Sequence, residues 1–440
     1  MTVHPPLHLV ATDKLIQALF RRSGAKTAGA SCHANNAIRH KILIRFKRCS
    51  CSAHLSLELL QLATRMSGYD TIWPADSAEF CPHPDALEVF VVGTYKLEQT
   101  PQSDEQVPSE AEAEDAGDTP PPEARKPQKR RGKCLMFCVQ DNDTFDLLQE
   151  TELPAILDMK WCHRVDDVTP ILGIADSEGH ITLHELDTRE RRMQQIQSIA
   201  CAATDTLCLS LDWSNRRSPT SGLGNLIVSL SNGSLSVLNP ENGRGLAVAD
   251  SWHAHDYEPW IAAWDYWNTN VVYSGGDDLK MKGWDVRQGG SSPLFVNKRF
   301  EAGVTTIQSH PHLEHLLAVG SYDNTVRLFD TRKPLVPLTQ VDVGGGAWRV
   351  KWHPSPTRRN DLLVACMHDG FKVVRLDLNG ENPSSTLPSS EQPWEVIKRF
   401  DKHESLAYGV DWSVAGDIGD DGTLVASCSF YDHTLYLWRA

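Results

Sequence analysis

The chain has 440 residues, of which 40% are apolar and 23% charged, a composition typical of a globular protein with a sizeable core. It lacks the apolar run of about 18 residues that a membrane span requires. The net charge of −14 argues against a nucleic-acid-binding protein, whose affinity would depend on neutralising phosphates. The 11 cysteines are scattered, without paired CxxC spacing, so we expect a cytoplasmic protein with no metal and no other cofactor.

The first 65 residues differ from the rest of the chain. They contain ten Lys/Arg and two Asp/Glu, a net charge of +8, so the remaining residues carry −22. A basic, acid-poor segment is typical of a mitochondrial presequence, which is one interpretation. The interpretation we favour is that residues 1–65 are a disordered or non-native extension and that Met66 is the true start.

Residues 66–440 contain a repeated two-part unit. The first half is a strand that ends in an aromatic residue and a small polar residue or proline, as in WRVKWHP (348–354). The second half is an apolar strand, a tight turn and an alternating strand, as in LLAVGSYDNTVRLFD (316–330). The other first halves are 78–82, 156–163, 209–214, 262–267, 305–311 and 407–413. The other second halves are 171–187, 226–239, 271–285, 362–377, 424–438 and a split pair at 89–97 and 133–140.

This repeat predicts an all-β fold, a seven-bladed β-propeller of the WD40 type. Alternation makes one face of each strand apolar, and stacking the sheets in a closed ring buries those faces. The end positions of the first halves are 42 to 60 residues apart, as expected for WD repeats with loop insertions. They are Trp161, Trp213, Trp267, Ser309, Trp352 and Trp412. Because the chain stops after the third strand of the last unit, its fourth strand is expected near GYDTIW (68–73).

An insertion at residues 99–131 separates the two strands of the split unit. It contains eight Asp/Glu, a PPP run and a basic end, and it has too few apolar residues to offset the entropy of ordering. We expect a disordered, solvated loop on the face that carries the SGGDD (274–278) and YDH (431–433) turns. A flexible arm that touches a partner is the alternative.

Several histidines have structural explanations. The HPHLEH segment (310–315) has metal-like spacing, but the same His-Pro pair recurs harmlessly at 353–354. His403 and Asp432 occupy places where WD repeats form a buried hydrogen-bonded network, and Asp323 has the matching place in its unit. His163 is expected on the opposite face.

Other polar residues lie in turns expected at the mouth of the central channel. They are His368, His433, Asp277 and Asp278. No GxSxG, HExxH or Walker motif is present, so catalytic residues have to be sought among such turns.

Several strings exceed what a propeller requires, notably WIAAWDYW (260–267), ACMHDGF (365–371) and SCSFYDH (427–433). With AILDMKWCH (155–163) and AVGSYDNTVRLFDTR (318–332), they resemble the diphthine methylesterase family of diphthamide biosynthesis. The resemblance covers Met66 to Ala440. It implies hydrolysis of the methyl ester of methylated diphthine on translation elongation factor 2, a folded protein substrate.

The resemblance supplies no catalytic residues, so their assignment rests on chemistry. Ester hydrolysis needs a base near neutral pH. We expect His368 or His433 to activate water with Asp278 orienting the imidazole; attack by Ser429 or Cys428 is the alternative.

The substrate's trimethylammonium group suits carboxylates and aromatic faces. Asp277, Tyr431 and Trp260, with Asp278, are the candidates for holding it. We expect a monomer. The alternative function is a non-catalytic WD scaffold for protein assembly, and an adaptor for lysine- or RNA-related cargo is a third reading that the net charge disfavours.

Overall fold

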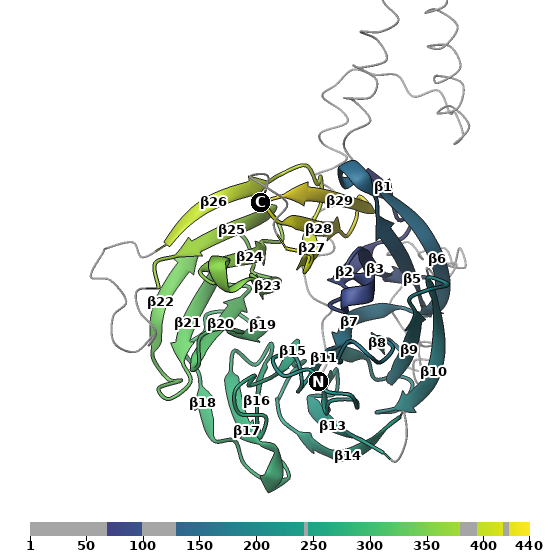
Figure 1. Ribbon diagram of the computed structural model, residues 1–440. Coiled ribbons are helices and arrows are strands. Elements are labelled where there is room, and N and C mark those ends of the chain that lie inside the picture. The colour runs from purple at the N-terminus through teal and green to yellow at the C-terminus, as the bar shows by residue number, and fades with distance from the viewer. Residues whose placement is uncertain (1–67, 99–128, 242–244, 379–393, 417–421) are drawn as a thin grey trace, which may run out of the picture. The chain divides into compact units, whose positions relative to one another are not determined.

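A computed structural model describes residues 68–98, 129–241, 245–378, 394–416 and 422–440. The expectations for residues 1–65 and for most of the 99–131 insertion lie outside these ranges. Seven antiparallel sheets follow one another around a ring, as Figure 1 shows. The predicted seven-bladed propeller is therefore confirmed. No helix in the described ranges is long and apolar enough to cross a bilayer.

Each blade runs from an innermost strand to an outermost one (Figure 1). The innermost strands are β2 (Ala75–Phe80), β7 (Ile156–Cys162), β11 (Cys208–Trp213), β15 (Ile261–Trp264), β19 (Val304–Ser309), β23 (Arg349–Trp352) and β27 (Ala407–Trp412). The second strands are β3 (Val89–Thr94), β8 (Ile171–Asp176), β12 (Leu226–Leu230), β16 (Val271–Gly275), β20 (Leu316–Ser321), β24 (Asp361–Ala365) and β28 (Leu424–Ser429).

The third strands are β5 (Arg130–Val139), β9 (His180–Asp187), β13 (Ser234–Pro240), β17 (Met281–Asp285), β21 (Thr325–Asp330), β25 (Phe371–Leu376) and β29 (Thr434–Arg439). The outermost are β6 (Phe145–Pro154), β10 (Arg192–Ala200), β14 (Leu246–His253), β18 (Phe295–Asn297), β22 (Pro337–Asp342), β26 (Trp394–Phe400) and β1 (Gly68–Asp70). The short strand β4 (Lys96–Leu97) also pairs with β5. Four 3-10 turns are η1 (Pro84–Ala86), η2 (Asp141–Asp143), η3 (Val286–Gln288) and η4 (Pro356–Arg358).

The ring closes where the sequence pattern predicts. Strand β1 pairs antiparallel with β29, placing Tyr69 opposite Leu435. Just after β1, the Thr71 backbone N–H donates to the His433 carbonyl at 2.8 Å. The last blade thus borrows its outer strand from the other end of the propeller, which removes an exposed sheet edge.

The core is divided among the blade interfaces. Seven clusters of buried apolar side chains fill the seven interfaces between neighbouring blades. In four of them a tryptophan at the end of an innermost strand donates its indole N–H to the innermost strand of the preceding blade. These bonds join Trp213 to Lys160, Trp264 to Asp212, Trp352 to Gln308 and Trp412 to Lys351.

This pattern corrects one sequence assignment. The end position of the fourth blade is Trp264 rather than Trp267. Strand β15 ends at Trp264, and Trp267 donates to His310 of the following blade instead, at 2.9 Å. Two nearby tryptophans in one segment made the sequence ambiguous.

The end of the 99–131 insertion also differs from expectation. Strand β5 begins at Arg130, so the last basic residues are ordered. The Arg130 Nε donates to the Tyr95 hydroxyl at 2.8 Å, and Arg131 pairs with Glu152 at 2.8 Å. Strand β4 comes just before the insertion, and it pairs with β5, the third strand of the first blade, in which the insertion ends.

A buried hydrogen-bonded chain links strands within two of the blades. In the last blade, Trp438 Nε1 donates to Ser427 Oγ at 3.0 Å, and His403 Nε2 lies 2.8 Å from the same hydroxyl. The other imidazole nitrogen, Nδ1, lies 2.6 Å from Ser429 Oγ, which donates to Asp432. The arrangement is the structural network expected for His403 and Asp432.

This network makes a prediction about stability. Burial lowers the pKa of His403 to about 4, so its neutral form belongs to the folded state. Its contribution is therefore present above pH 6.5 and is lost as the pH falls from 6.5 toward 4. We expect His403→Asn to lower the free energy of unfolding by about 3 kcal/mol at pH 7. The deficit should shrink toward pH 4 in urea titrations, whereas the exposed His253→Asn should show a small difference at every pH. A deficit for His403→Asn that stays constant with pH would contradict this assignment.

Candidate functional site

The candidate residues occupy one face of the propeller. We call it the upper face, where innermost strands begin and second strands end. Asp277 lies in the turn between β16 and β17, His368 between β24 and β25, and Tyr431 and His433 between β28 and β29. Trp260 directly precedes β15. All of the sequence-derived candidates therefore share this face.

Strand register places seven equivalent residues around the mouth of the channel. Each lies four residues before the end position of its innermost strand: Asp76, Leu157, Leu209, Trp260, Thr305, Trp348 and Tyr408. In five blades the pairing register shifts at this residue, which marks a β-bulge. Bulges re-aim side chains and are common beside functional sites. Three of the seven positions hold aromatic residues, and one holds a carboxylate.

Aromatic rings form a connected arc on this mouth, from the fourth blade to the seventh. Trp348 lies 5.7 Å from Trp260, 5.9 Å from Tyr322 and 4.7 Å from Tyr408, measured between ring centroids. Tyr408 continues to Phe430 at 5.2 Å, which contacts Tyr431 at 5.0 Å. We call Trp260, Tyr322, Trp348, Tyr408, Phe430 and Tyr431 the aromatic collar.

A glycine run before β23 lets Trp348 reach its place. At Gly345, a Cβ atom would lie 2.1 Å from the Cys366 carbonyl oxygen, so only glycine permits this approach. The neighbouring Met367 packs on the same apolar cluster as Trp348 and has a positive φ of 38°. The turn that carries His368 is thus held against the collar.

Two of the predicted cation-binding residues meet directly. Trp260 Nε1 donates to Asp277 Oδ1 at 2.7 Å. Burial raises the pKa of Asp277; the bond from Trp260 opposes that rise, and the neighbouring carboxylates of Glu258 and Asp278 add to it. Tyr431, at the far end of the collar, is 62% exposed, so it can meet a docked partner.

A carboxylate that the sequence reasoning missed lies beside the collar. Asp76 is 6% exposed, and among the described residues its carboxylate has no hydrogen bond and no direct ion pair. Burial raises the pKa of Asp76 to about 7, although Arg349 opposes the rise. Burial raises the pKa of the Tyr408 hydroxyl most and Asp76 raises it next, while for Tyr322 Asp76 adds a smaller rise after burial, Tyr408 and Asp277. Aligning the innermost strands on their end residues would have revealed this position.

Below the mouth, ion pairs join the innermost strands of different blades. Lys351 contacts Glu79 and lies 3.3 Å from Asp411, and Lys160 lies 2.9 Å from Glu79. Lys160 and Lys351 also line a small cavity of about 30 Å³.

The two histidines proposed as bases lie on the rim. His368 is exposed and His433 partly exposed, and neither imidazole has a hydrogen-bond or ion-pair partner within the described ranges. His433 has a φ of 56°, and its carbonyl accepts from Thr71 at the ring closure. Both imidazoles are free to bind water, but they come from different blades and are not brought together by any described contact.

The structure corrects the role expected of Asp278. Its Oδ1 accepts from His255 Nδ1 at 2.8 Å instead of orienting His368 or His433. His255 Nε2 continues to Ser274 Oγ at 2.7 Å, and Trp284 Nε1 donates to the same hydroxyl at 2.9 Å. Burial raises the pKa of Asp278, but the bond from His255 and the nearby lysines outweigh it, so the pKa lies below its usual value. Asp278 thus belongs to a structural network like that of His403.

The side chains considered as protein nucleophiles are inaccessible. Ser429 and Cys428 are each 0% exposed. Ser429 is held by Asp432 in the network of the last blade. Burial raises the pKa of the Cys428 thiol above its usual range, so its thiolate is disfavoured. The geometry favours attack by water.

The remaining histidines have separate partners. His310 Nε2 donates to the Arg359 carbonyl and His312 Nε2 to the Pro354 carbonyl, while His315 lies near Thr331. Within the described ranges, no three His, Cys, Asp or Glu side chains converge as metal ligands would. His163 follows β7 at the lower end of the channel, on the face opposite the collar.

The collar suits a particular chemistry. Aromatic faces and carboxylates attract a quaternary ammonium, which carries no N–H and so cannot be held by hydrogen bonds. In the collar, the rings of Trp260, Trp348 and Tyr408 adjoin one another, and Asp76 and Asp277 lie beside them. Free imidazoles on the rim can accept a proton from water.

Comparison with known proteins identifies the family. The WD domain, G-beta repeat model matches residues 293–330 and 394–439. The diphthine methyltransferase of Mus musculus is 39% identical over 79% of this chain and 69% of its own length. The diphthine methyltransferase homolog of Dictyostelium discoideum is 34% identical over 83% of this chain and 96% of its own.

A structural comparison shows the fold alone. A chain in the crystal structure of a mitotic checkpoint complex superposes with a TM-score of 0.57 at 15% identity, covering 85% of this chain and 93% of that one. The sequence relatives are more specific, since they extend over most of the propeller and most of their own length. This chain therefore belongs to the diphthine methyltransferase family of WD-repeat proteins.

Proposed function

We propose that this protein hydrolyses the methyl ester of methylated diphthine on translation elongation factor 2, a step of diphthamide biosynthesis. The names of its relatives support a substrate of the diphthine type. The observation that carries the proposal is the unpaired Asp76 carboxylate beside the aromatic collar. The free thiols of the described cysteines suit the cytosol as the place of reaction.

The proposed roles divide between cation and ester. Trp260, Asp277 and Tyr431, together with ionised Asp76, hold the trimethylammonium group. His368 or His433 takes a proton from a water molecule while the oxygen of that water bonds to the carbonyl carbon of the ester. The bond from that carbon to the methoxy oxygen then breaks, and the methoxide receives the proton and leaves as methanol. In this proposal the protein acts as a monomer and docks the folded substrate on its upper face.

The test uses the full chain and elongation factor 2 that carries methylated diphthine. The mass of the substrate is followed with time, and loss of one methylene unit (methyl replaced by hydrogen) is expected. His368→Ala and His433→Ala identify the base, since the variant that lacks it should lose about a hundredfold in kcat.

Two other outcomes would overturn the proposal. An unchanged mass with protein shown to be folded by circular dichroism would indicate a scaffold. A gain in mass when S-adenosylmethionine is supplied would indicate methyl transfer to the substrate.

A further inference from the structure

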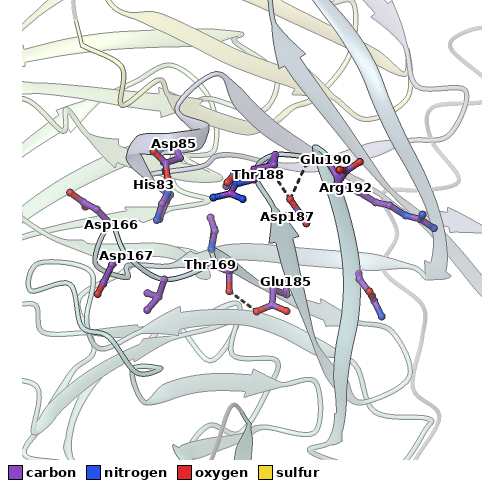
Figure 2. Close-up of a pocket in the computed structure, with 14 residues that line it drawn as sticks. His83, Asp85, Asp166, Asp167, Thr169, Glu185, Asp187, Thr188, Glu190 and Arg192 are labelled. Atoms are coloured by element: carbon purple, nitrogen blue, oxygen red, sulfur yellow. Dashed lines mark hydrogen bonds between the residues drawn. The ribbon is translucent and has the colours of Figure 1, made fainter.

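A cavity on the lower face, opposite the collar, has no role in the proposed reaction. Its volume is about 870 Å³, and it lies between the loops that end the innermost strands of the first two blades (Figure 2). Six carboxylates line it, against the two guanidinium groups of Arg189 and Arg192. The acidic residues are Asp85, Asp166, Asp167, Glu185, Asp187 and Glu190.

Most of these carboxylates are unpaired. Asp85, Asp166, Asp167 and Glu190 are exposed, and within the described ranges none of them forms an ion pair. Repulsion between like charges in a concave site costs free energy, which a bound cation relieves. The cavity therefore favours positive charge and disfavours phosphate-bearing ligands.

A buried histidine supplies an independent indication of a ligand. His83 is 4% exposed, and Figure 2 shows it between Asp85 and Asp167, directed toward the cavity. Its Nδ1 accepts from the Asp85 backbone N–H at 3.2 Å, so its hydrogen is on Nε2. That Nε2–H is buried and has no acceptor among the described residues. An unsatisfied buried donor is rare in folded proteins.

Nearby histidines of two other blades show how a buried ring of this kind is satisfied. His310 and His353 directly follow the end position of their innermost strands, where the first blade has Cys81, and His83 comes two residues later. Each of the two accepts from a nearby backbone N–H through Nδ1, as His83 does. Their Nε2 atoms lie 2.8 Å from an acceptor in the next blade, the Arg359 carbonyl for His310 and the Thr423 hydroxyl for His353. His83 lines the cavity, and its Nε2 has no such acceptor among the described residues.

The second blade's loop beside the cavity pairs with the third blade. Arg164 forms a bridge with Thr220, and its guanidinium donates to the Ser221 carbonyl at 2.6 Å. The Thr220 N–H donates to the His163 carbonyl at 3.2 Å. These bonds anchor residues 163–165 to the third blade, and none of them supplies an acceptor to His83.

We propose that this cavity binds a basic peptide segment of a partner protein. A main-chain carbonyl of the peptide accepts from His83 Nε2, as the Arg359 carbonyl does from His310. Its arginine or lysine side chains pair with Asp85, Asp166 and Asp167. Small movements of the surrounding loops expose the His83 nitrogen to the peptide.

Binding is tested with the full chain and a short fluorescein-labelled peptide of alternating arginine and glycine, followed by anisotropy at low salt. Saturable binding is expected for this peptide and none for its serine–glycine counterpart. Asp166→Asn/Asp167→Asn should weaken binding about tenfold. His83→Phe, which keeps an aromatic ring but removes the donor, should weaken it about fivefold.

The control removes two charges from the upper face, Glu178→Gln/Asp205→Asn, and should bind like the unaltered protein. Thermal melts establish that each variant is folded. An equal loss in the control pair would show attraction by net charge alone and overturn the proposal. Binding that does not saturate would also overturn it. So would the combination of two results: spermine displaces the peptide at equal affinity, and His83→Phe binds the peptide as well as the unaltered protein does. In that case the cavity would recognise only the positive charges of the peptide. The readout is binding, so it stands apart from the outcome of the ester assay.

Discussion

Asp76→Asn is expected to lower kcat/KM for methylated elongation factor 2 by about a hundredfold. Asp76 is the one carboxylate at the channel mouth that is both buried and unpaired among the described residues. Asparagine has nearly the same shape but carries no charge to attract the trimethylammonium group. The measurement is steady-state kinetics by mass spectrometry at several pH values.

The pH profile separates this role from a structural one. Since the pKa of Asp76 is about 7, kcat/KM should fall as the pH drops below 7, where the carboxyl is protonated. A bound cation stabilises the ionised form, so the fall in kcat should occur at lower pH. Asp76→Asn should lose the part of this fall that comes from Asp76 and keep only the part that comes from protonation of the histidine base. An unchanged acid limb in the variant would exclude Asp76 as the titrating group.

The same substitution, Asp76→Asn, should raise the free energy of unfolding although it lowers activity. A carboxyl whose pKa rises on folding contributes stability that is present below pH 3.8 and is lost as the pH rises through 7. Asp76→Asn should therefore be more stable than the parent at pH 8, by at most about 4 kcal/mol, and similar at pH 4. Lower activity with higher stability is the signature of a functional carboxylate, whereas a structural one would lower both.

Trp260→Leu and Asp277→Asn are each expected to raise KM about tenfold with little change in kcat. Both side chains are proposed to hold the substrate cation, and the 2.7 Å bond from Trp260 to Asp277 couples them. The double variant should therefore lose less than the product of the single losses. Additive losses would indicate that the two residues act separately.

A matched pair of exposed tyrosines provides the control. Tyr431 is 62% exposed and contacts Phe430 in the collar, whereas Tyr257 is 63% exposed on the same face with no described aromatic contact. Tyr431→Ala should raise KM, and Tyr257→Ala should not. If both raise KM equally, these residues serve docking of the protein substrate rather than recognition of the ammonium group.

The collar and the lower cavity lie on opposite faces of one ring. The collar joins aromatic surfaces to two carboxylates, whereas the lower cavity joins unpaired carboxylates to one buried N–H donor. The first suits a fixed cation without hydrogens, and the second suits a peptide that offers both cations and a carbonyl. On the two proposals together, the ring holds its substrate on one face and a second protein on the other.

The sequence by itself determined the fold class, the number of blades and the closing strand at residues 68–70. These features depend on period-two alternation and on the spacing of end residues, which are local properties of the chain. It also predicted that the candidate turns share one face, because turns between second and third strands must lie on one side of a propeller. The structure shows in addition that Trp260 and Asp277 meet on that face.

Only the tertiary structure decided which polar residues are free to act. Asp278 and Asp277 are neighbours in one turn, yet His255, from the loop before the strand, pairs with the first while the second faces Trp260. Asp76 joined the site through a β-bulge that shifts its register, and His83 stood out because its buried Nε2 has no acceptor among the described residues. Contacts between strands far apart in sequence set each of these outcomes, and no local pattern records them.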